Sequence, residues 1–393
     1  MLGLLAGAGV RAGDAFELKD GDRVVLVGNT LIEREQRYGH WEAALTRRWP
    51  DRNITFRNLG WSGDTVFGDA RAGFDNAAKG FSRLTEGVLS LKPTVIVIAY
   101  GSNEAFAGAD GLPAFVKGLD KLLDALTPAK ARVVLLAPFR QEDMGRPLPD
   151  PTAQNKNLRL YRDALQDAAK KRDLTFVDSL FSRDEGKVPL TDNGIHLTDL
   201  GYWRTSFTME KGLGLPALGW RVEIDATGKM VKTTKGTKVE KATFAPLRFQ
   251  ATDATLPAVS MKAGKDSWYI PPVERTLRVT GLPAGHYTLS IDGNSVATAS
   301  ADKWAEGVRL MSGPEFEQSE RLREAIVAKN RLYFHRWRPQ NETYLFGFRK
   351  HEQGKNAREV PLFDPLVEKQ EAEIAKLRVP AAHTYELKEE PKR

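Results

Sequence analysis

The sequence predicts an α/β protein whose first half is a doubly wound, three-layer sandwich around a parallel five-stranded sheet. Between Asp22 and Leu180, short β-branched runs alternate with longer stretches of helical period, which is typical of repeated βα units. The run Val95-Ile96-Val97-Ile98 is apolar without interruption, as expected of a central strand covered on both faces. After about residue 216 the period changes to two, which predicts a smaller, antiparallel β domain.

The elements of the first half can be placed in chain order. The predicted strands are 23–27, 54–58, 94–99, 132–137 and 174–177. Between them, apolar residues recur three and four apart, which predicts amphipathic helices at 38–48, 81–91, 114–126 and 155–169. A further helix is expected to open at His196 and to run through Tyr202 and Phe207. Ligands of such sheets bind beyond the carboxyl ends of the strands.

The second half predicts a β-rich region followed by returning helices. Period-two strands are expected at 221–224, 242–251, 276–280 and 286–291. Helices are expected at 314–337 and 366–377, and the intervening segment 333–348 is dense in aromatic and charged residues. The predicted divisions after a short leader are a domain at 14–215, a β-rich domain at 216–312, a helical return at 313–380 and a disordered, charged tail at 381–393.

Composition restricts the class of function. The 393 residues include 58 Lys and Arg and 51 Asp and Glu, and the two signs are interleaved, so no nucleic-acid partner is expected. Cys is absent, which excludes thiol nucleophiles, disulfides and Cys-based metal sites. The His residues show no i,i+4 pairing, and the first predicted strand is not followed by a phosphate-binding loop. Neither a metal nor a cofactor is therefore expected.

The N-terminus predicts export. Residues 1–13 are mostly small and apolar, and Val10-Arg11-Ala12 has the small residues that signal peptidase prefers. We therefore expect a signal-peptide remnant and a secreted or periplasmic protein, although the usual basic start is missing, and a terminus without function is the alternative. No other segment reaches the roughly 18–20 apolar residues of a transmembrane helix, so no membrane span is expected.

Four short segments place reactive side chains near predicted strand ends or loops of the same sheet. They are Gly28-Asn29-Thr30-Leu31, Ser62-Gly63-Asp64-Thr65, Gly101-Ser102-Asn103-Glu104 and Asp192-Asn193-Gly194-Ile195-His196. A hydroxyl, a glycine amide, a carboxamide and an imidazole are thus expected to meet at one rim. These groups are the nucleophile, oxyanion donors and general base that an acyl-transfer site requires.

The four segments resemble the signature blocks of the SGNH/GDSL hydrolases, a family of esterases, lipases and carbohydrate deacetylases on a flavodoxin-like sheet. The resemblance covers roughly residues 20–212. It implies that Thr30 stands at the nucleophile position and that Gly63 and Asn103 are the oxyanion donors. His196 matches the catalytic base of the family.

Three departures from the family pattern weaken the expected chemistry. Asn29 and Thr30 stand where the family has Asp and Ser, and the methyl group of Thr stiffens χ1 and crowds the path of attack. Asn193 stands where the family has Asp, so it can orient the ring of His196 but brings no negative charge to an imidazolium. Asp192 is the alternative partner of the ring. Thr30 could instead serve only as a helix cap.

The sequence therefore predicts an ester hydrolase without a cofactor, whose partner is a small-molecule or glycan ester, with O-acetylated carbohydrate as the suggested substrate. Glu104 is expected to brace its loop rather than to perform chemistry. The alternative is a non-catalytic protein of the same fold that binds glycans or acts as a scaffold, because all three departures fall in the catalytic blocks.

Overall fold

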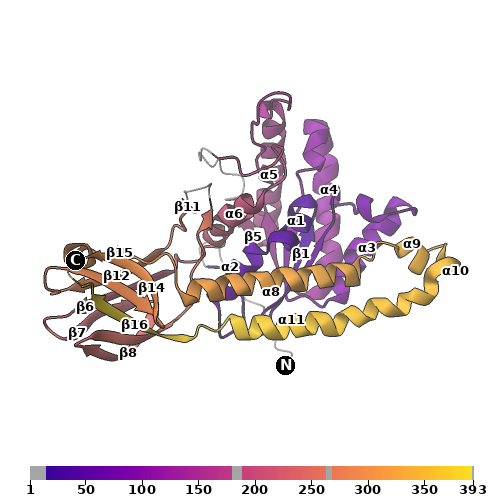
Figure 1. Ribbon diagram of the computed structural model, residues 1–393. Coiled ribbons are helices and arrows are strands. Elements are labelled where there is room, and N and C mark those ends of the chain that lie inside the picture. Colours follow the sequence, from indigo (N-terminus) through magenta and orange to yellow (C-terminus); the bar gives the residue numbers. More distant parts are fainter. Residues whose placement is uncertain (1–14, 179–187, 263–267, 392–393) are drawn as a thin grey trace, which may run out of the picture. The chain divides into compact units, whose positions relative to one another are not determined.

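The protein is described by a computed structural model over residues 15–178, 188–262 and 268–391, and the chain divides into two compact units (Figure 1). Unit 1 comprises Met1–Glu42, Arg52–Pro216 and Val327–Gln370. Unit 2 comprises Ala43–Asp51, Ala217–Ile326 and Glu371–Arg393. The expected signal-peptide remnant at 1–13 lies outside the described residues. No helix in the described ranges is apolar over a length that would cross a bilayer.

Unit 1 is built on a parallel five-stranded sheet, which confirms the predicted fold class. The strands, each within two residues of its predicted bounds, are β1 (Arg23–Gly28), β2 (Thr55–Gly60), β3 (Val95–Ala99), β4 (Arg132–Leu136) and β5 (Thr175–Val177). Their order is β2-β1-β3-β4-β5, so the winding reverses between β1 and β3. That reversal is the place where ligands bind in open α/β sheets.

The helices of the first half follow the strands as expected, with two differences. They are α1 (Thr30–Tyr38), α2 (His40–Arg48), α3 (Ala77–Ser90), α4 (Gly108–Leu126), α5 (Thr152–Arg172) and α6 (Asp199–Gly212), with 3-10 helices η1 (Asp69–Arg71), η2 (Glu104–Ala107) and η3 (Thr127–Ala129). The sequence placed no helix with bounds at α1 and considered one there only through the alternative role of Thr30 as a cap, because the buried face of α1 includes Glu33, Glu35 and Gln36 and so lacks an apolar period.

The prediction that His196 opens the last of these helices is wrong. The helix α6 begins at Asp199, and the side chain of Thr198 caps it by accepting from the Gly201 N–H at 3.2 Å. His196 therefore lies in the connection before the helix, where its ring is free of the helical backbone.

The returning helices contribute to the core of unit 1. They are α8 (Pro314–Trp337), α9 (Glu342–Leu345), α10 (Lys350–Gln353), η5 (Gly354–Leu362) and α11 (Phe363–Leu377). Tyr333 of α8 and Val367 of α11 join the buried cluster that contains Val27 of β1 and Leu84 of α3. Since α8 and α11 each supply residues to both units, the predicted segment 313–380 is not a division of its own.

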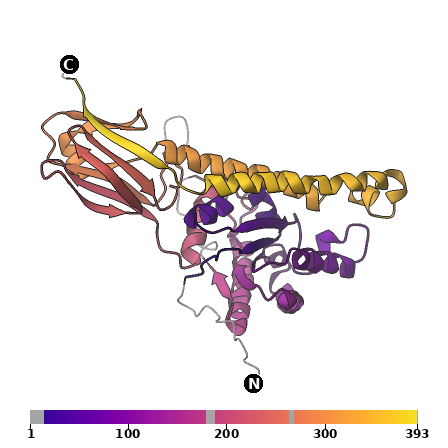
Figure 2. The same ribbon diagram turned by 90° about the horizontal axis from the view of Figure 1, so that it is seen from below.

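Unit 2 contains two β-sheets, of order β15-β12-β6-β7 and β14-β13-β16-β9-β8, and an antiparallel β10-β11 pair. Figure 2 shows the strands of this unit from below. The strands are β6 (Gly219–Asp225), β7 (Met230–Lys235), β8 (Thr237–Phe244), β9 (Leu247–Asp253), β10 (Met261–Lys262), β11 (Trp268–Tyr269), β12 (Glu274–Thr280), β13 (His286–Ile291), β14 (Asn294–Ser300), β15 (Val308–Arg309) and β16 (Ala382–Glu389), and one short helix is α7 (Ala301–Glu306). The pairing is antiparallel, as predicted, except that β6 and β12 are parallel.

Two predictions for the second half are wrong. The expected strand 242–251 is two strands, β8 and β9, because the chain turns at Ala245-Pro246 and proline has no N–H to continue a ladder. The tail 381–393, expected to be disordered, forms β16 between β13 and β9. Tyr385 and Leu387 are buried there and alternate with charged residues. This alternation is the period-two pattern of a β-strand, although the segment as a whole is highly charged.

Candidate active site

The first block turns from β1 into α1 at the carboxyl edge of the sheet. Asn29 is the N-cap of α1: its Oδ1 accepts from the Leu31 N–H at 3.1 Å, and its Nδ2 donates to Ser102 Oγ at 2.6 Å. An amide can fill both roles because it carries an acceptor and a donor. The capping role that the sequence left open for Thr30 thus belongs to Asn29. Thr30 is the first residue of the helix, and it is partly exposed.

The expected nucleophile, Thr30, and the first expected oxyanion donor, Gly63, contact each other in the structure. The Gly63 N–H donates to Thr30 Oγ1 at 3.4 Å, although the two residues are far apart in the sequence. Gly63 has a φ of 76°, a conformation that favours glycine, and a Cβ placed there would meet nothing within 4 Å. The positive φ angle, rather than a lack of space for a side chain, therefore explains why glycine occupies position 63. Gly63 is exposed, and its N–H contacts the Thr30 hydroxyl.

The second donor, Asn103, reaches the same loop. Its Nδ2 donates to the Asp64 carbonyl oxygen at 2.8 Å, which uses one of its two hydrogens and leaves the other for a ligand. Glu104 braces the loop as predicted: its carboxylate accepts from the Val66 N–H at 2.9 Å and from the Gly101 N–H at 2.8 Å. Burial raises the pKa of this carboxyl. The second and third blocks are thereby held together.

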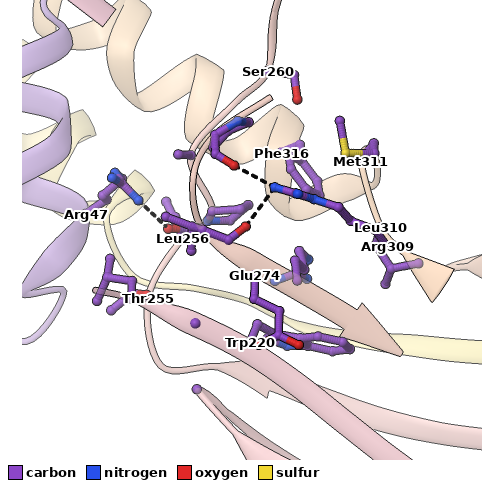
Figure 3. A pocket seen from close by; sticks show the side chains of 18 residues that line it. Arg47, Trp220, Thr255, Leu256, Ser260, Glu274, Arg309, Leu310, Met311 and Phe316 are labelled. Atoms are coloured by element: carbon purple, nitrogen blue, oxygen red, sulfur yellow. Dashed lines mark hydrogen bonds between the residues drawn. The ribbon is translucent and has the colours of Figure 1, made fainter. Parts of the chain in front are cut away.

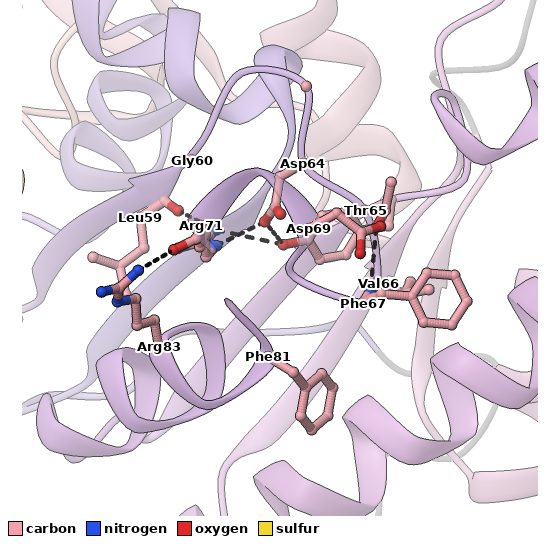
Figure 4. A network of polar contacts seen from close by, with 12 residues as sticks. Leu59, Gly60, Asp64, Thr65, Val66, Phe67, Asp69, Arg71, Phe81 and Arg83 are labelled. Atoms are coloured by element: carbon pink, nitrogen blue, oxygen red, sulfur yellow. Dashed lines mark hydrogen bonds and ion pairs between the residues drawn. The ribbon is translucent and has the colours of Figure 1, made fainter. Parts of the chain in front are cut away.

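A buried polar network anchors the segment Ser62-Gly63-Asp64-Thr65, which we call the oxyanion loop (Figure 4). Asp64 is completely buried, and its Oδ2 accepts from Arg71 Nε at 2.7 Å and from the Tyr100 hydroxyl at 2.6 Å. Arg71 also donates to the Leu59 carbonyl oxygen at 2.9 Å, so it joins the loop to the end of β2. Sequence reasoning missed this role of Asp64, because nothing in the local pattern distinguishes a buried carboxylate from a turn residue.

The fourth block is a tight loop held by backbone and side-chain bonds. Thr191 and Leu197 form a β-bridge across it. The carboxylate of Glu142 accepts from the Thr191 N–H at 2.8 Å. Within the loop, Asn193 Oδ1 accepts from the N–H groups of Ile195 at 3.1 Å and His196 at 2.9 Å. The oxygen end of the Asn193 amide is therefore fixed.

The fixed amide determines the tautomer of His196. Asn193 Nδ2 lies 3.1 Å from His196 Nδ1, and an amide nitrogen can only donate. Nδ1 therefore accepts, and the neutral ring carries its hydrogen on Nε2. A ring in this form donates from Nε2 but cannot take a proton there. This is the opposite of the form that a general base requires.

Asp192, the alternative partner of the ring, is engaged elsewhere. Its Oδ2 pairs with Arg34 Nη2 at 2.7 Å. Burial, followed by the charge of Arg34, lowers the pKa of His196, and the charge of Asp192 only partly opposes them. His196 is therefore neutral at pH 7, and Asn193 rather than Asp192 contacts its ring.

The fourth block is tied to the helix that begins at Thr30. Arg34 lies one turn after Thr30, on the same face of α1. Besides Asp192 it contacts the Leu197 carbonyl oxygen at 3.4 Å, so it binds residues on both sides of His196. Tyr202 of α6 donates to the Leu31 carbonyl oxygen at 2.6 Å. These contacts draw the four blocks together at one end of the sheet.

Nowhere in the ranges 15–178, 188–262 and 268–391 do three or more His, Asp or Glu side chains gather in a way that could hold a metal ion.

Comparisons with known proteins agree with this architecture. Residues 20–204 match the GDSL-like Lipase/Acylhydrolase family. A solved structure of a gut microbial diltiazem-metabolizing enzyme has a TM-score of 0.74 and 16% identity, and the match covers 96% of this chain and 100% of that one. At this identity the likeness shows a shared fold.

Two smaller solved structures match about half of the chain. An acetylxylan esterase from Geobacillus stearothermophilus has a TM-score of 0.41 and 17% identity over 51% of this chain and 98% of that one. An alpha/beta hydrolase from the metagenome of Lake Arreo, Spain, has a TM-score of 0.41 and 20% identity over 50% of this chain and 97% of that one. A sequence search of curated proteins found no match.

Proposed function

We propose that the chain, whose residues 20–204 match the GDSL-like Lipase/Acylhydrolase family, is a carboxylic ester hydrolase, and that its substrate is an O-acetylated carbohydrate attacked by Thr30. The observation that carries the role of Thr30 is its contact with the Gly63 N–H at 3.4 Å. A hydroxyl beside an oxyanion donor supplies two of the three groups that acyl transfer requires, and His196 is assigned the third, the general base.

The exposure of the candidate site residues favours a substrate in which a small acyl group is attached to a bulky alcohol. Gly63 and Asn193 are exposed, and Thr30 and Asn103 are partly exposed. Phe106 lies three residues after Asn103, and its side chain is 62% exposed. An exposed aromatic ring on the segment that follows Asn103 is a surface on which a sugar ring can pack. Export of the chain, which the N-terminal sequence predicts, is part of the same proposal because it brings the enzyme to external glycans.

In the proposed reaction each of these groups has one role. Thr30 Oγ attacks the acyl carbon, and the developing oxyanion accepts from the Gly63 N–H and from the remaining Nδ2 hydrogen of Asn103. The Thr30 proton passes to His196 Nε2 and then to the oxygen of the leaving alcohol. Water, activated in the same way, hydrolyses the acyl group from Thr30. Both proton transfers to Nε2 require the tautomer with hydrogen on Nδ1.

Asn193 makes that tautomer the minor one. With hydrogen on both Nδ1 and the facing Nδ2, two donors would oppose each other at 3.1 Å. The proposal therefore includes slow turnover that is limited by proton transfer rather than by binding of the ester.

The test is hydrolysis of 4-nitrophenyl acetate and acetylated xylo-oligosaccharides by the wild type and by Thr30→Ala and His196→Ala. Each substitution is expected to lower kcat/KM by at least about 10²-fold, because each removes a group that reacts. Thr127→Ala and His351→Ala are the matched controls, since both residues are exposed and remote in sequence from the four blocks, and their rates should equal that of the wild type.

Thr30→Ser refines the test. It keeps the hydroxyl and removes the methyl group that crowds the attack, so a gain of roughly tenfold is expected. If Thr30→Ala and His196→Ala instead retain the wild-type rate, the assigned residues are wrong. The non-catalytic alternative then predicts that the same oligosaccharides bind without being hydrolysed.

A further inference from the structure

The two units contain cavities of very different size. In unit 2, a small cavity of about 40 Å³ lies beside Trp220, Leu256 and Phe316 (Figure 3). Two of its cationic side chains already have acceptors: Arg47 donates to the Leu256 carbonyl oxygen, and Arg309 donates to that of Val273 at 2.9 Å. This space suits a few water molecules rather than a ligand.

Unit 1 contains a cavity of about 660 Å³, within the range of small-molecule sites. It lies between the edge strand β2, the helix α3 and the returning segment, and we call it the return cavity. Thr30, Gly63, Asn103 and His196 are not among the residues that line it. The cavity is therefore separate from the candidate active site.

The walls of the return cavity are largely apolar and aromatic. Tyr333, Trp337 and Phe346 supply three rings, and Leu59 and Leu91 supply aliphatic surface from β2 and from the end of α3. Burial raises the pKa of Tyr333 to about 12, so its phenol is neutral at physiological pH. Aromatic walls of this kind hold a flat ring by offset or edge-to-face contacts.

One polar group of the return cavity lacks a partner. The indole Nε1 of Trp337 is buried and has no acceptor within the described part of the chain. A buried N–H without an acceptor costs free energy, because water no longer solvates it. An acceptor on a bound molecule would give Trp337 the partner that the protein does not supply.

The charges around the cavity disfavour an anion. The carboxylates of Glu342, Asp364 and Glu368 outnumber the guanidinium groups of Arg57 and Arg336. Arg336 Nε is paired with Asp364 at 2.8 Å, and the Arg57 guanidinium lies over the Tyr333 ring at 4.9 Å. A negatively charged ligand would therefore enter a lining of net negative charge in which both cations are already in contact with other groups.

We propose that the return cavity binds an aromatic small molecule that carries a hydrogen-bond acceptor and no negative charge. Trp337 is in edge contact with Trp61, with ring centroids 5.8 Å apart, and Trp61 directly precedes Ser62-Gly63. The Arg338 guanidinium lies 3.6 Å from the centroid of the Trp61 ring. Arg338 Nη1 also pairs with Glu33 Oε2 at 2.8 Å. The cavity and the oxyanion loop thus share the Trp61–Trp337 pair.

The test uses two probes that differ in one group. Indole-3-acetamide is neutral and has a carbonyl acceptor, whereas indole-3-acetate is an anion of the same shape. Binding of each to the full chain is measured by calorimetry or ligand-observed NMR, without any ester present. The amide is expected to bind at least about tenfold more tightly than the acetate.

Variants locate the binding in the cavity. Gly87 of α3 lines the cavity, and a Cβ there would meet nothing within 4 Å. Gly87→Leu fills the space and should weaken indole-3-acetamide binding at least about tenfold, whereas the matched Gly87→Ala should change it less than about threefold. Trp337→Phe keeps a ring but removes the N–H, so it should cost about fivefold.

Replacing a glycine inside a helix favours folding, and thermal melting checks that both Gly87 variants are folded. Unchanged binding in Gly87→Leu, or no binding of either probe at millimolar concentration, overturns the proposal. If Gly87→Leu does not fold, Trp337→Phe decides, and unchanged binding there has the same meaning. Because no hydrolysis is measured, the result does not depend on the proposed function.

Discussion

The candidate active site has an oxyanion side and a proton-transfer side, and the chain supplies them unequally. On the oxyanion side, the expected donor Gly63 contacts Thr30, and the expected donor Asn103 contacts the Asp64 carbonyl oxygen. The buried carboxylates of Asp64 and Glu104 hold the loops of these residues. On the proton-transfer side, Thr30 replaces a serine and Asn193 holds His196 in the tautomer that does not accept a proton. Under the proposed function, the difference implies that proton transfer, rather than binding of the acyl carbonyl, limits the rate.

Asn193→Asp should have the largest effect on the rate, because it gives His196 the negatively charged partner that the proton-transfer side lacks. One carboxylate oxygen keeps the bonds from the Ile195 and His196 N–H groups, and the other accepts from Nδ1–H. The base-competent tautomer then dominates, and the imidazolium gains a negative neighbour. Since the reverse change in a serine protease costs about 10⁴-fold, kcat for 4-nitrophenyl acetate should rise by about 10²–10⁴-fold.

Asp192→Asn is the matched control for that gain. It alters the adjacent residue and removes the partner of Arg34 without touching the bond to Nδ1, so its rate should stay within about tenfold of the wild type. Equal rates for Asn193→Asp and the wild type would show that the tautomer does not limit turnover, and the contrast between the two sides would then be lost.

Asp64→Asn should destabilise the oxyanion side, because it removes the buried carboxylate that holds the oxyanion loop. Asp64 is completely buried, and Arg71 is 2% exposed, so the substitution leaves a buried guanidinium without its counter-charge. Breaking a buried pair in this way costs about 3–5 kcal/mol of unfolding free energy, measurable by urea denaturation. Asp69→Asn is the control, because that exposed carboxylate in the same loop bonds to Thr65 and should change stability by at most about 0.5 kcal/mol.

Asn103→Ala removes one oxyanion donor and should lower kcat by about 10²–10³-fold with little change in KM, since the bond strengthens as charge develops. The measurement is sharpest in the Asn193→Asp background, where the chemical step is fast enough to follow. If the two sides are independent, the factor is the same in both backgrounds. A loss confined to KM would instead assign Asn103 to ground-state binding.

The sequence could place the expected oxyanion donors near one edge of the sheet because the information for their positions is local. Gly63 and Asn103 follow buried strands, and parallel strands bring such positions to one edge. Strands β1 to β5 were predictable for the same reason. By contrast, α1 was missed because Glu33 and Glu35 are buried on its inner face, and β16 was missed because charged residues alternate with Tyr385 and Leu387.

The proton-transfer side could not be read from the sequence in the same way. That Asn193 replaces an acid was visible, but its effect depends on which end of the amide faces the ring. Two backbone N–H groups settle that orientation, and they belong to the three-dimensional loop. The pairing of Asp192 with Arg34 likewise depends on how the loop lies against α1.

The smallest expected effect is a shift in pH dependence that separates charge from geometry at His196. Burial and the charge of Arg34 lower the pKa of His196, so the neutral ring persists further into the acid range. Because only the neutral ring can act as a base, the acid limb of the wild-type kcat/KM profile should lie below the usual histidine pKa of about 6.5. In Asn193→Asp the new carboxylate raises the pKa, and the limb should move to higher pH. A limb that moves to lower pH in this variant would mean that the carboxylate does not face Nδ1, whatever the change in rate.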